Sequence, residues 1–162
     1  MSIAMNRLLV IIVAASALVV PGTALAQTTL WGGTTGTPGG EPVSGIQFQS
    51  IQLGVASGRV RVNSVQAVMS CTNTEDGLVS PVAFWAVNSP RVALRRNRFT
   101  LNFPAEAGGR DGVVRLTGLL GSNGRGTVRL NLTATAVDSD RNLVIERCVG
   151  AVTYQVRRGR PA

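Results

Sequence analysis

Apolar and polar residues alternate along most of this chain after position 45, which is the pattern of half-buried β-strands. Phe99, Leu101 and Phe103 give a clear example, because polar Thr and Asn separate them. Residues 128–136 repeat the pattern, with an apolar residue at every second position. The residues between such runs are rich in Gly, Asn, Asp and Ser, which favour turns. The pattern therefore predicts strands joined by short turns.

About eight such strands are expected between Gly45 and Arg158, and they predict an all-β fold. We expect an antiparallel β-sandwich, immunoglobulin-like or jelly-roll-like, with a β-barrel as the alternative. The parity of the apolar positions changes near Ser50, where we expect a β-bulge, and it changes again between Val62 and Val65.

Two further local patterns are informative. The run 121–126 (GSNGRG) predicts a hairpin turn. In the apolar run 82–87, Phe84 and Trp85 are neighbours and must point to opposite faces of a strand, so one enters the core. An outward-facing Trp85 stacks on a sugar or anchors a protein contact; the commoner alternative is that a loop or the N-terminal segment covers it.

The first 26 residues have the organisation of a secretory signal peptide. Arg7 precedes the apolar run Leu8–Val20, which is shorter than the roughly 20 residues that span a bilayer. An A-x-A motif then ends at Ala26. We expect cleavage after Ala26 and no stable transmembrane segment in the chain that remains. The expected location is secreted or extracytoplasmic.

The composition divides the remaining chain into three parts. Residues 27–44 are rich in Gly, Thr and Pro and predict a flexible N-terminal lead-in, in which Trp31 is expected to dock on the domain. Residues 45–158 form the β-sandwich domain, and 159–162 form a basic C-terminal tail.

The chain has two cysteines, Cys71 and Cys148. In an exported protein, an even pair predicts a disulfide rather than a metal site or a nucleophile. The bridge would close a loop of nearly 80 residues, for which the chain-entropy model gives about 4 kcal/mol of stabilisation.

The order of these features resembles that of uncharacterised secreted bacterial β-sandwich domains. The features are Cys71, the Phe-rich strand, the hairpin at Asn123 and Gly124, and Cys148 followed by an alternating last strand. The resemblance covers roughly 45–158 and implies a sandwich fold, but it brings no activity and no functional residues.

All 16 basic residues are arginines, and the chain contains neither Lys nor His. After removal of Arg7, 15 arginines face 8 acidic residues, so the net charge is about +7. Triads and dyads that need His or Lys are therefore excluded, as are the usual His/Cys zinc and copper sites. We expect no enzymatic activity. A carboxylate-based hydrolase is the remaining catalytic alternative, and it would need two acidic residues that face each other across a cleft.

Several arginines are clustered, and Arg95, Arg96 and Arg98 form the densest group beside Arg91. Two interpretations are open. The cluster is either a solvated basic face that reflects genome composition, or a binding site for anionic polymers, because guanidinium groups pair with phosphate and carboxylate.

A candidate cation site follows the longest alternating run. Asp138, Asp140 and Asn142 stand at positions 1, 3 and 5 of a calcium-type loop, and Glu146 stands at position 9. The glycine expected at position 6 and the glutamate expected at position 12 are absent. The favoured alternative is that these side chains cap a tight turn. No cofactor other than this candidate Ca²⁺ is expected.

These observations favour a non-catalytic, exported β-sandwich that acts as an extracellular or cell-envelope binding or structural module. Its partner would be a protein or an anionic polymer. The main alternative is Arg-mediated binding of an envelope polymer or nucleic acid. Nucleic acid is the less expected of the two, because single strands bind to several exposed aromatic rings.

Overall fold

A computed structural model gives the structure of this chain, and it describes residues 27–36, 48–106, 110–138 and 140–159. The predicted signal peptide (1–26) lies outside the described residues. So do most of the C-terminal tail, from 160 onward, and the second half of the predicted lead-in.

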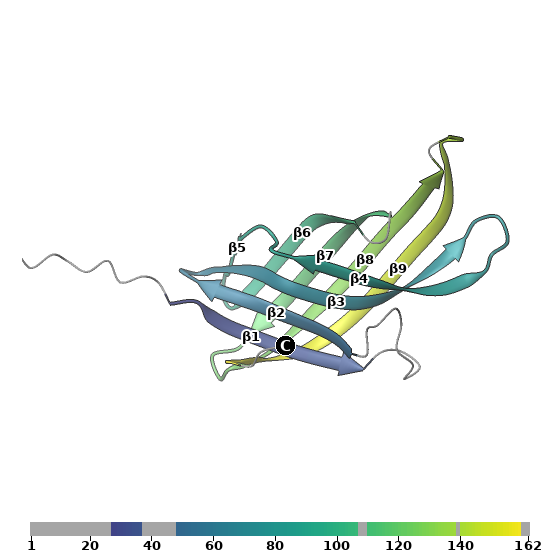
Figure 1. Cartoon of the computed structure of the whole chain (residues 1–162). Helices are drawn as coiled ribbons and strands as arrows, with labels where there is room; N and C mark the ends of the chain where they lie inside the picture. Colours follow the sequence, from purple (N-terminus) through teal and green to yellow (C-terminus); the bar gives the residue numbers. More distant parts are fainter. Residues whose placement is uncertain (1–26, 37–47, 107–109, 139, 160–162) are drawn as a thin grey trace, which may run out of the picture.

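The described part of the chain consists of β-strands and contains no helix (Figure 1). The nine strands are β1 (Thr29–Gly36), β2 (Phe48–Ala56), β3 (Arg59–Asn73), β4 (Val79–Val87), β5 (Val92–Ala93), β6 (Arg98–Glu106), β7 (Asp111–Leu120), β8 (Arg125–Asp138) and β9 (Leu143–Arg158). Every pairing between them is antiparallel. The prediction of an all-β, antiparallel fold is confirmed, with one strand more than the eight expected.

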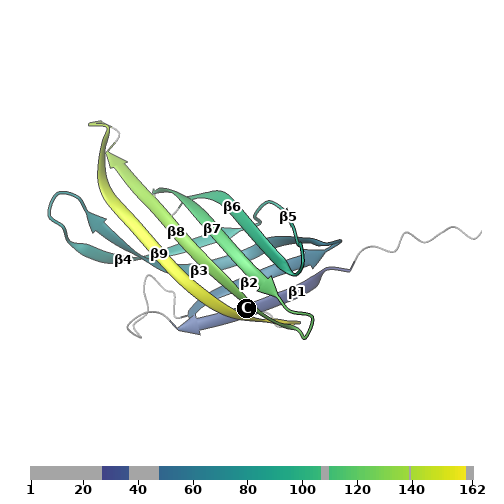
Figure 2. The same cartoon turned by 180° about the vertical axis from the view of Figure 1, so that it is seen from behind.

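The strands form one sheet that folds over itself into two layers. Their order is β4-β3-β2-β1-β9-β8-β7-β6, and β5 pairs with β3 outside this order. Figures 1 and 2 show the layer β1–β4 lying across the layer β6–β9 at a large angle. Within each layer, strands that follow one another in sequence are neighbours. The described part of the fold is therefore a sandwich of two meanders, without the Greek-key crossovers of immunoglobulin and jelly-roll domains.

The layers are joined at two corners, as is typical when sheets pack at a large angle. At one corner β1 pairs with the end of β9, where Trp31 faces Arg158. At the other corner β3 changes its partner: it pairs with β2 as far as Gln66 and with β9 from Ser70. The disulfide between Cys71 and Cys148 lies at this second corner and confirms the predicted pairing.

Side chains satisfy the backbone groups that β3 exposes where it leaves β2. The backbone N–H of Val68 donates to Oε1 of the buried Gln49 (3.1 Å). The hydroxyl of Tyr154, on β9, donates to the backbone carbonyl of Gln66 (2.8 Å). Unpaired backbone groups inside a protein are costly, so these two side chains allow the strand to turn from one layer to the other.

The core lies between the layers, as the alternating pattern predicts. Leu101, Leu116, Leu130 and Val152 show how each strand of the second layer directs every second side chain inward. The prediction that Phe84 and Trp85 point to opposite faces of their strand is also confirmed, because Phe84 is fully buried and Trp85 is exposed.

The prediction of a flexible lead-in over residues 27–44 is wrong for Thr29–Gly36, which form β1 between β2 and β9. Trp31 is buried in the core, as expected. A Cβ on Gly33 would collide with the backbone carbonyl of Gln155 on β9. The glycine therefore allows two strands to approach closely and is not a sign of flexibility.

The parity change between Val62 and Val65 is confirmed. The register of β2 with β3 shifts between Gln52 and Leu53, which leaves Asn63 as an extra residue in β3. The bulge expected near Ser50 is absent. The β1–β2 register is regular there, and the polar side chain of Gln49 occupies the inward position.

The predicted hairpin turn at 121–126 joins β7 to β8, with Gly124 at a positive φ of 78°. The described ranges also hold no helix that could reach across a lipid bilayer.

Candidate anion-binding site

The described arginines and carboxylates are distributed unevenly between the two ends of the strands. Fourteen arginines are described, since Arg7 and Arg160 lie outside the described residues. Nine of them lie in the turns and strand ends at one end of the fold, which we call the basic end: Arg59, Arg61, Arg91, Arg95, Arg96, Arg98, Arg125, Arg157 and Arg158. Figures 1 and 2 show that the β3–β4 and β8–β9 turns project away from this end.

The carboxylates occupy the opposite end. All six acidic residues whose side chains are described lie in the β3–β4 turn, the β8–β9 turn or the adjoining ends of β7, β8 and β9. We call this the acidic end, and its acidic residues are Glu75, Asp76, Asp111, Asp138, Asp140 and Glu146. No described carboxylate belongs to the basic end.

Backbone hydrogen bonds hold the loops of the basic end together. They connect the β2–β3 turn to the residue that follows β5, the β5–β6 turn to the end of β7, and the β7–β8 turn to the end of β9. The donor and acceptor pairs are Leu94 to Gly58 (2.8 Å), Leu120 to Asn97 (2.8 Å) and Arg158 to Gly124 (2.9 Å). Loops that are distant in sequence thus form one continuous surface.

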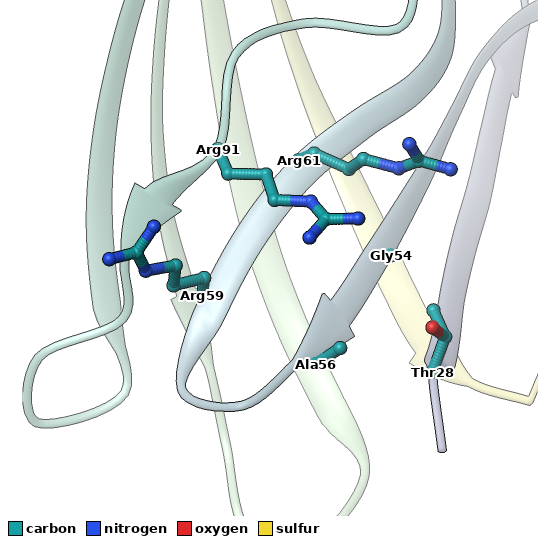
Figure 3. Close-up of a pocket in the computed structure, with 6 residues that line it drawn as sticks. All are labelled: Thr28, Gly54, Ala56, Arg59, Arg61 and Arg91. Carbon is teal, nitrogen blue, oxygen red and sulfur yellow. The ribbon is translucent and has the colours of Figure 1, made fainter. Parts of the chain in front are cut away.

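Three arginines of the basic end line a hollow on the outer face of the β1–β4 layer, and Figure 3 shows them. Arg59 and Arg61 share this face because alternate residues of a strand point to the same side. Arg61 and Arg91 extend in the same direction, towards β2, whereas Arg59 extends away from them (Figure 3). The remaining lining residues are small: Thr28, Gly54 and Ala56.

Arg91 is placed beside Arg61 by the residues on either side of it. The backbone N–H of Ser89 donates to the carbonyl of Val62 (3.0 Å), and the N–H of Val62 donates to Oγ of Ser89 (2.8 Å). On the other side, β5 pairs with β3 from Val92. The segment that carries Arg91 is therefore bonded to β3 at both ends.

The β-bulge of β3 shapes the hollow. Nε of Arg61 donates to Oδ1 of Asn63, the extra residue of the bulge (2.9 Å). A Cβ on Gly54 would lie 3.2 Å from the same Oδ1 and 3.3 Å from Cγ2 of Thr28. The glycine therefore keeps the floor of the hollow open beneath the guanidinium group of Arg61.

The arginines of the basic end have no carboxylate counter-ion within 4.0 Å among the described residues. The two described ion pairs, Arg110–Glu146 and Arg141–Asp138, both lie at the acidic end. One basic-end arginine has another partner, because the guanidinium of Arg158 lies over the ring of Trp31, 5.3 Å from its centroid. The basic end thus concentrates positive charge that the described protein groups do not neutralise.

The sequence-predicted cluster Arg95, Arg96 and Arg98 belongs to the same end. Arg95 and Arg98 each donate an N–H to the other's carbonyl (both 2.9 Å), which closes a two-residue turn. Both central residues have positive φ, 49° at Arg96 and 65° at Asn97, as in a type I′ turn. The turn presents exposed arginines to solvent.

The other sequence-predicted binding residue, Trp85, is 51% exposed on the outer face of β4. The described part of the chain does not cover it, although a covered Trp was the favoured alternative.

The four residues of the candidate calcium loop do not form a cluster. Oδ1 of Asp138 accepts the backbone N–H groups of Asp140 (3.0 Å) and Arg141 (3.3 Å), which is the turn-capping role of the alternative interpretation. Asn142 has a positive φ of 52° in the same turn. Glu146 lies farther along β9, opposite Ala136, and is paired with Arg110. The geometry gives the calcium site no support.

A single group of three ligand-type side chains occurs among the described residues: Cys71, Glu146 and Cys148. The two sulfur atoms form the disulfide. Since thiolates are the sulfur ligands of metals, this group is not a metal centre in the oxidised protein.

The sequence pattern alone did not bring Arg59 and Arg61 together with Arg91. The available signal was the i, i+2 spacing of the two β3 arginines. The third arginine joins them through the pairing of β5 with the start of β3.

Comparison of the chain with protein-family models, with curated proteins and with solved structures found no match.

Proposed function

We propose that this protein is an exported, non-catalytic binding module that holds anionic polymers at its basic end. The observation that carries the proposal is the separation of charge, with nine arginines and no described carboxylate at that end. A basic surface that only kept the protein soluble would not need its carboxylates collected at the opposite end.

The chemistry of arginine suits such a ligand. Its planar guanidinium group donates paired hydrogen bonds to phosphate or carboxylate and stays charged at every physiological pH. The hollow beside Arg61 and Arg91 has a volume of about 30 Å³, far below the roughly 300–1,000 Å³ of a small-molecule pocket. It suits a single anionic group of an extended chain better than an enclosed small ligand.

The backbone conformation of the arginine turn adds support. A non-glycine residue at positive φ costs free energy, and Arg96 has neither the short polar side chain nor the missing Cβ that this region favours. Like charges held close together also lower stability. The basic end keeps both the unfavourable backbone conformation of Arg96 and the repulsion between its like charges. This is consistent with selection for a property of that surface.

Two features of the chain support the proposal that the protein is exported. A disulfide is typical of proteins in oxidising compartments outside the cytoplasm. The predicted signal peptide over 1–26 supplies the route of export. We infer that the ligand is an extracellular or cell-envelope polymer.

Binding of the oxidised protein to inorganic polyphosphate at increasing salt tests the proposal. Affinity should fall steeply with ionic strength, because each neutralised phosphate releases counterions. The triple variant Arg59→Gln, Arg61→Gln, Arg91→Gln should bind at least tenfold more weakly. The control triple Arg115→Gln, Arg129→Gln, Arg147→Gln has the same net charge but leaves the basic end intact, and it should bind nearly as the wild type does. Equal losses in both triples would reduce the effect to net charge and contradict the proposal.

A second candidate function is contact with a protein through the acidic end. Eight of the twelve exposed large apolar side chains lie towards this end: Leu78, Val79, Val113, Val137, Leu143, Val144, Ile145 and Val149. An apolar surface of this kind favours association that depends little on salt. Binding of a partner that persists at high ionic strength, and that Leu78→Ser with Leu143→Ser abolishes, would support it.

A further inference from the structure

We propose that the anionic polymer is an acidic polysaccharide, and that Trp85 forms the sugar-stacking part of the same site. This inference rests on the proposed function, since it names the class of polymer that the basic end holds. It follows from the face that Trp85 shares with the three arginines of the hollow, and from the polar side chains beside its ring.

Trp85 and the hollow share one surface, the outer face of the β1–β4 layer. Trp85 pairs with Gln66 of β3, and Arg61 lies five positions before Gln66 on the same strand. At about 3.3 Å per residue, and with the bulge at Asn63 between them, the two rows lie about 15 Å apart. A chain that crosses the face can therefore touch the exposed ring and the guanidinium groups together.

The residues beside the ring carry hydrogen-bonding side chains. The row through Trp85 continues to Gln66, Ser50 and Thr34 on successive strands. The hydroxyl of Ser50 donates to Oε1 of Gln66 (3.4 Å), so the two side chains lie in contact. Hydroxyl and amide groups next to an exposed aromatic ring are suited to a sugar, which presents hydroxyls at its edge and C–H groups on its face.

The alternatives fit this face less well. A polyphosphate has no ring for Trp85 to cover. A single-stranded nucleic acid stacks successive bases on several aromatic side chains, whereas Trp85 is the one exposed aromatic side chain in the described part of this chain. A glycan that carries carboxylate or phosphate groups satisfies both the single ring and the arginines.

Four probes test the inference on the oxidised full chain: polygalacturonate, inorganic polyphosphate, oligothymidylate and uncharged dextran. Polygalacturonate should bind more tightly than polyphosphate at equal charge concentration and should change the fluorescence of Trp85. The only other tryptophan, Trp31, is buried but lies under the guanidinium of Arg158, so the fluorescence change that remains in Trp85→Ala gives its share of the signal. Trp85→Ala should weaken polygalacturonate binding about tenfold, the scale of a lost stacking contact, and should leave polyphosphate binding unchanged.

Two variants separate stacking from general disturbance of β4. Trp85→Phe keeps a ring and should retain most of the affinity for polygalacturonate. Val87→Ala removes the neighbouring exposed side chain of the same face and should have little effect. An equal loss in Val87→Ala would overturn the stacking role.

The outcomes distinguish this inference from the proposed function. Equal binding of polygalacturonate and polyphosphate, both insensitive to Trp85→Ala, overturns the polysaccharide and leaves the anionic polymer. A preference for oligothymidylate that depends on Trp85 overturns it in favour of nucleic acid, and dextran bound as well as polygalacturonate overturns the acidic class. Failure of all the charged probes to bind overturns the proposed function itself.

Discussion

The hydroxyl of Tyr154 donates a 2.8 Å hydrogen bond to the backbone carbonyl of Gln66 and joins the two layers of the fold. Tyr154 lies on β9 and is fully buried, and Gln66 is the last residue of β3 that pairs with β2. The outward side chain of Gln66 lies in the row of Trp85. One bond therefore connects the core to the face on which we place the binding site.

Tyr154→Phe should lower the free energy of unfolding by about 1–3 kcal/mol, because the partly buried carbonyl of Gln66 loses its partner. Urea denaturation of both proteins measures the difference, and an unchanged slope would show that the unfolded state is not altered. Thr127→Val removes an exposed hydroxyl that bonds Gln155 and serves as the control, with a change below about 0.5 kcal/mol. Equal stability of Tyr154→Phe and wild type would contradict the structural role of the bond.

Stability should also depend on alkaline pH through this residue. Burial raises the pKa of the Tyr154 hydroxyl above its usual value of 10. The folded state therefore favours the protonated form, so the associated stability is complete below pH 10 and is lost as pH rises towards the folded-state pKa. Since Tyr154 is the only tyrosine and the chain has no lysine, the free energy of unfolding should fall by up to about 1.4 kcal/mol per pH unit above pH 10. Tyr154→Phe should give a flat profile over the same range.

Reduction of the Cys71–Cys148 disulfide should destabilise the fold by about 4 kcal/mol, because the bridge joins residues 77 positions apart. Urea denaturation with and without a reductant gives the value. The double variant Cys71→Ala, Cys148→Ala should match the reduced wild type and should not respond to reductant. A difference below about 1 kcal/mol would mean that the pairing of β3 with β9 alone holds this corner.

Arg96→Asn should raise stability by about 0.5 kcal/mol while it weakens polyanion binding. Asn tolerates the positive φ of this position better than Arg does, and the substitution removes one positive charge from the basic end. Thermal denaturation and polyphosphate binding at two salt concentrations measure the two effects. Arg95→Asn removes the same charge at a residue outside the positive-φ pair and should not raise stability.

Millimolar Ca²⁺ should leave the melting temperature unchanged. The carboxylate of Asp138 is used within its own turn, and Glu146 is paired with Arg110. Differential scanning calorimetry with Ca²⁺ or with a chelator tests this. A rise in melting temperature with Ca²⁺ that Asp140→Asn removes would restore the cation site.

Some features of the candidate site could be predicted from the local sequence. The neighbours Phe84 and Trp85 had to divide between core and surface, because adjacent strand residues face opposite ways. The change of parity after Val62 marked the bulge at Asn63, since an inserted residue reverses the inward and outward positions. Trp85, Arg95, Arg96 and Arg98 were named as binding residues, and the structure leaves all four exposed.

Other features could not be predicted from the local sequence, because they depend on residues that are distant in sequence. β1 has too few apolar residues to be recognised, and it exists because β2 and β9 supply its hydrogen bonds from both sides. Gln49 looks like a surface residue, and its burial follows from the unpaired N–H of Val68 that it satisfies.

The sequence by itself determined the fold class, the disulfide and the overall positive charge. Periodicity, cysteine number and composition are local or additive properties, so they need no knowledge of which strands meet. The tertiary structure decided where the charge lies. Hairpin pairing returns every turn to one of two ends, so that nine of the fourteen described arginines lie at one end and all six described carboxylates lie at the other. A site assembled by strand pairing becomes visible only when the order and register of the strands are known.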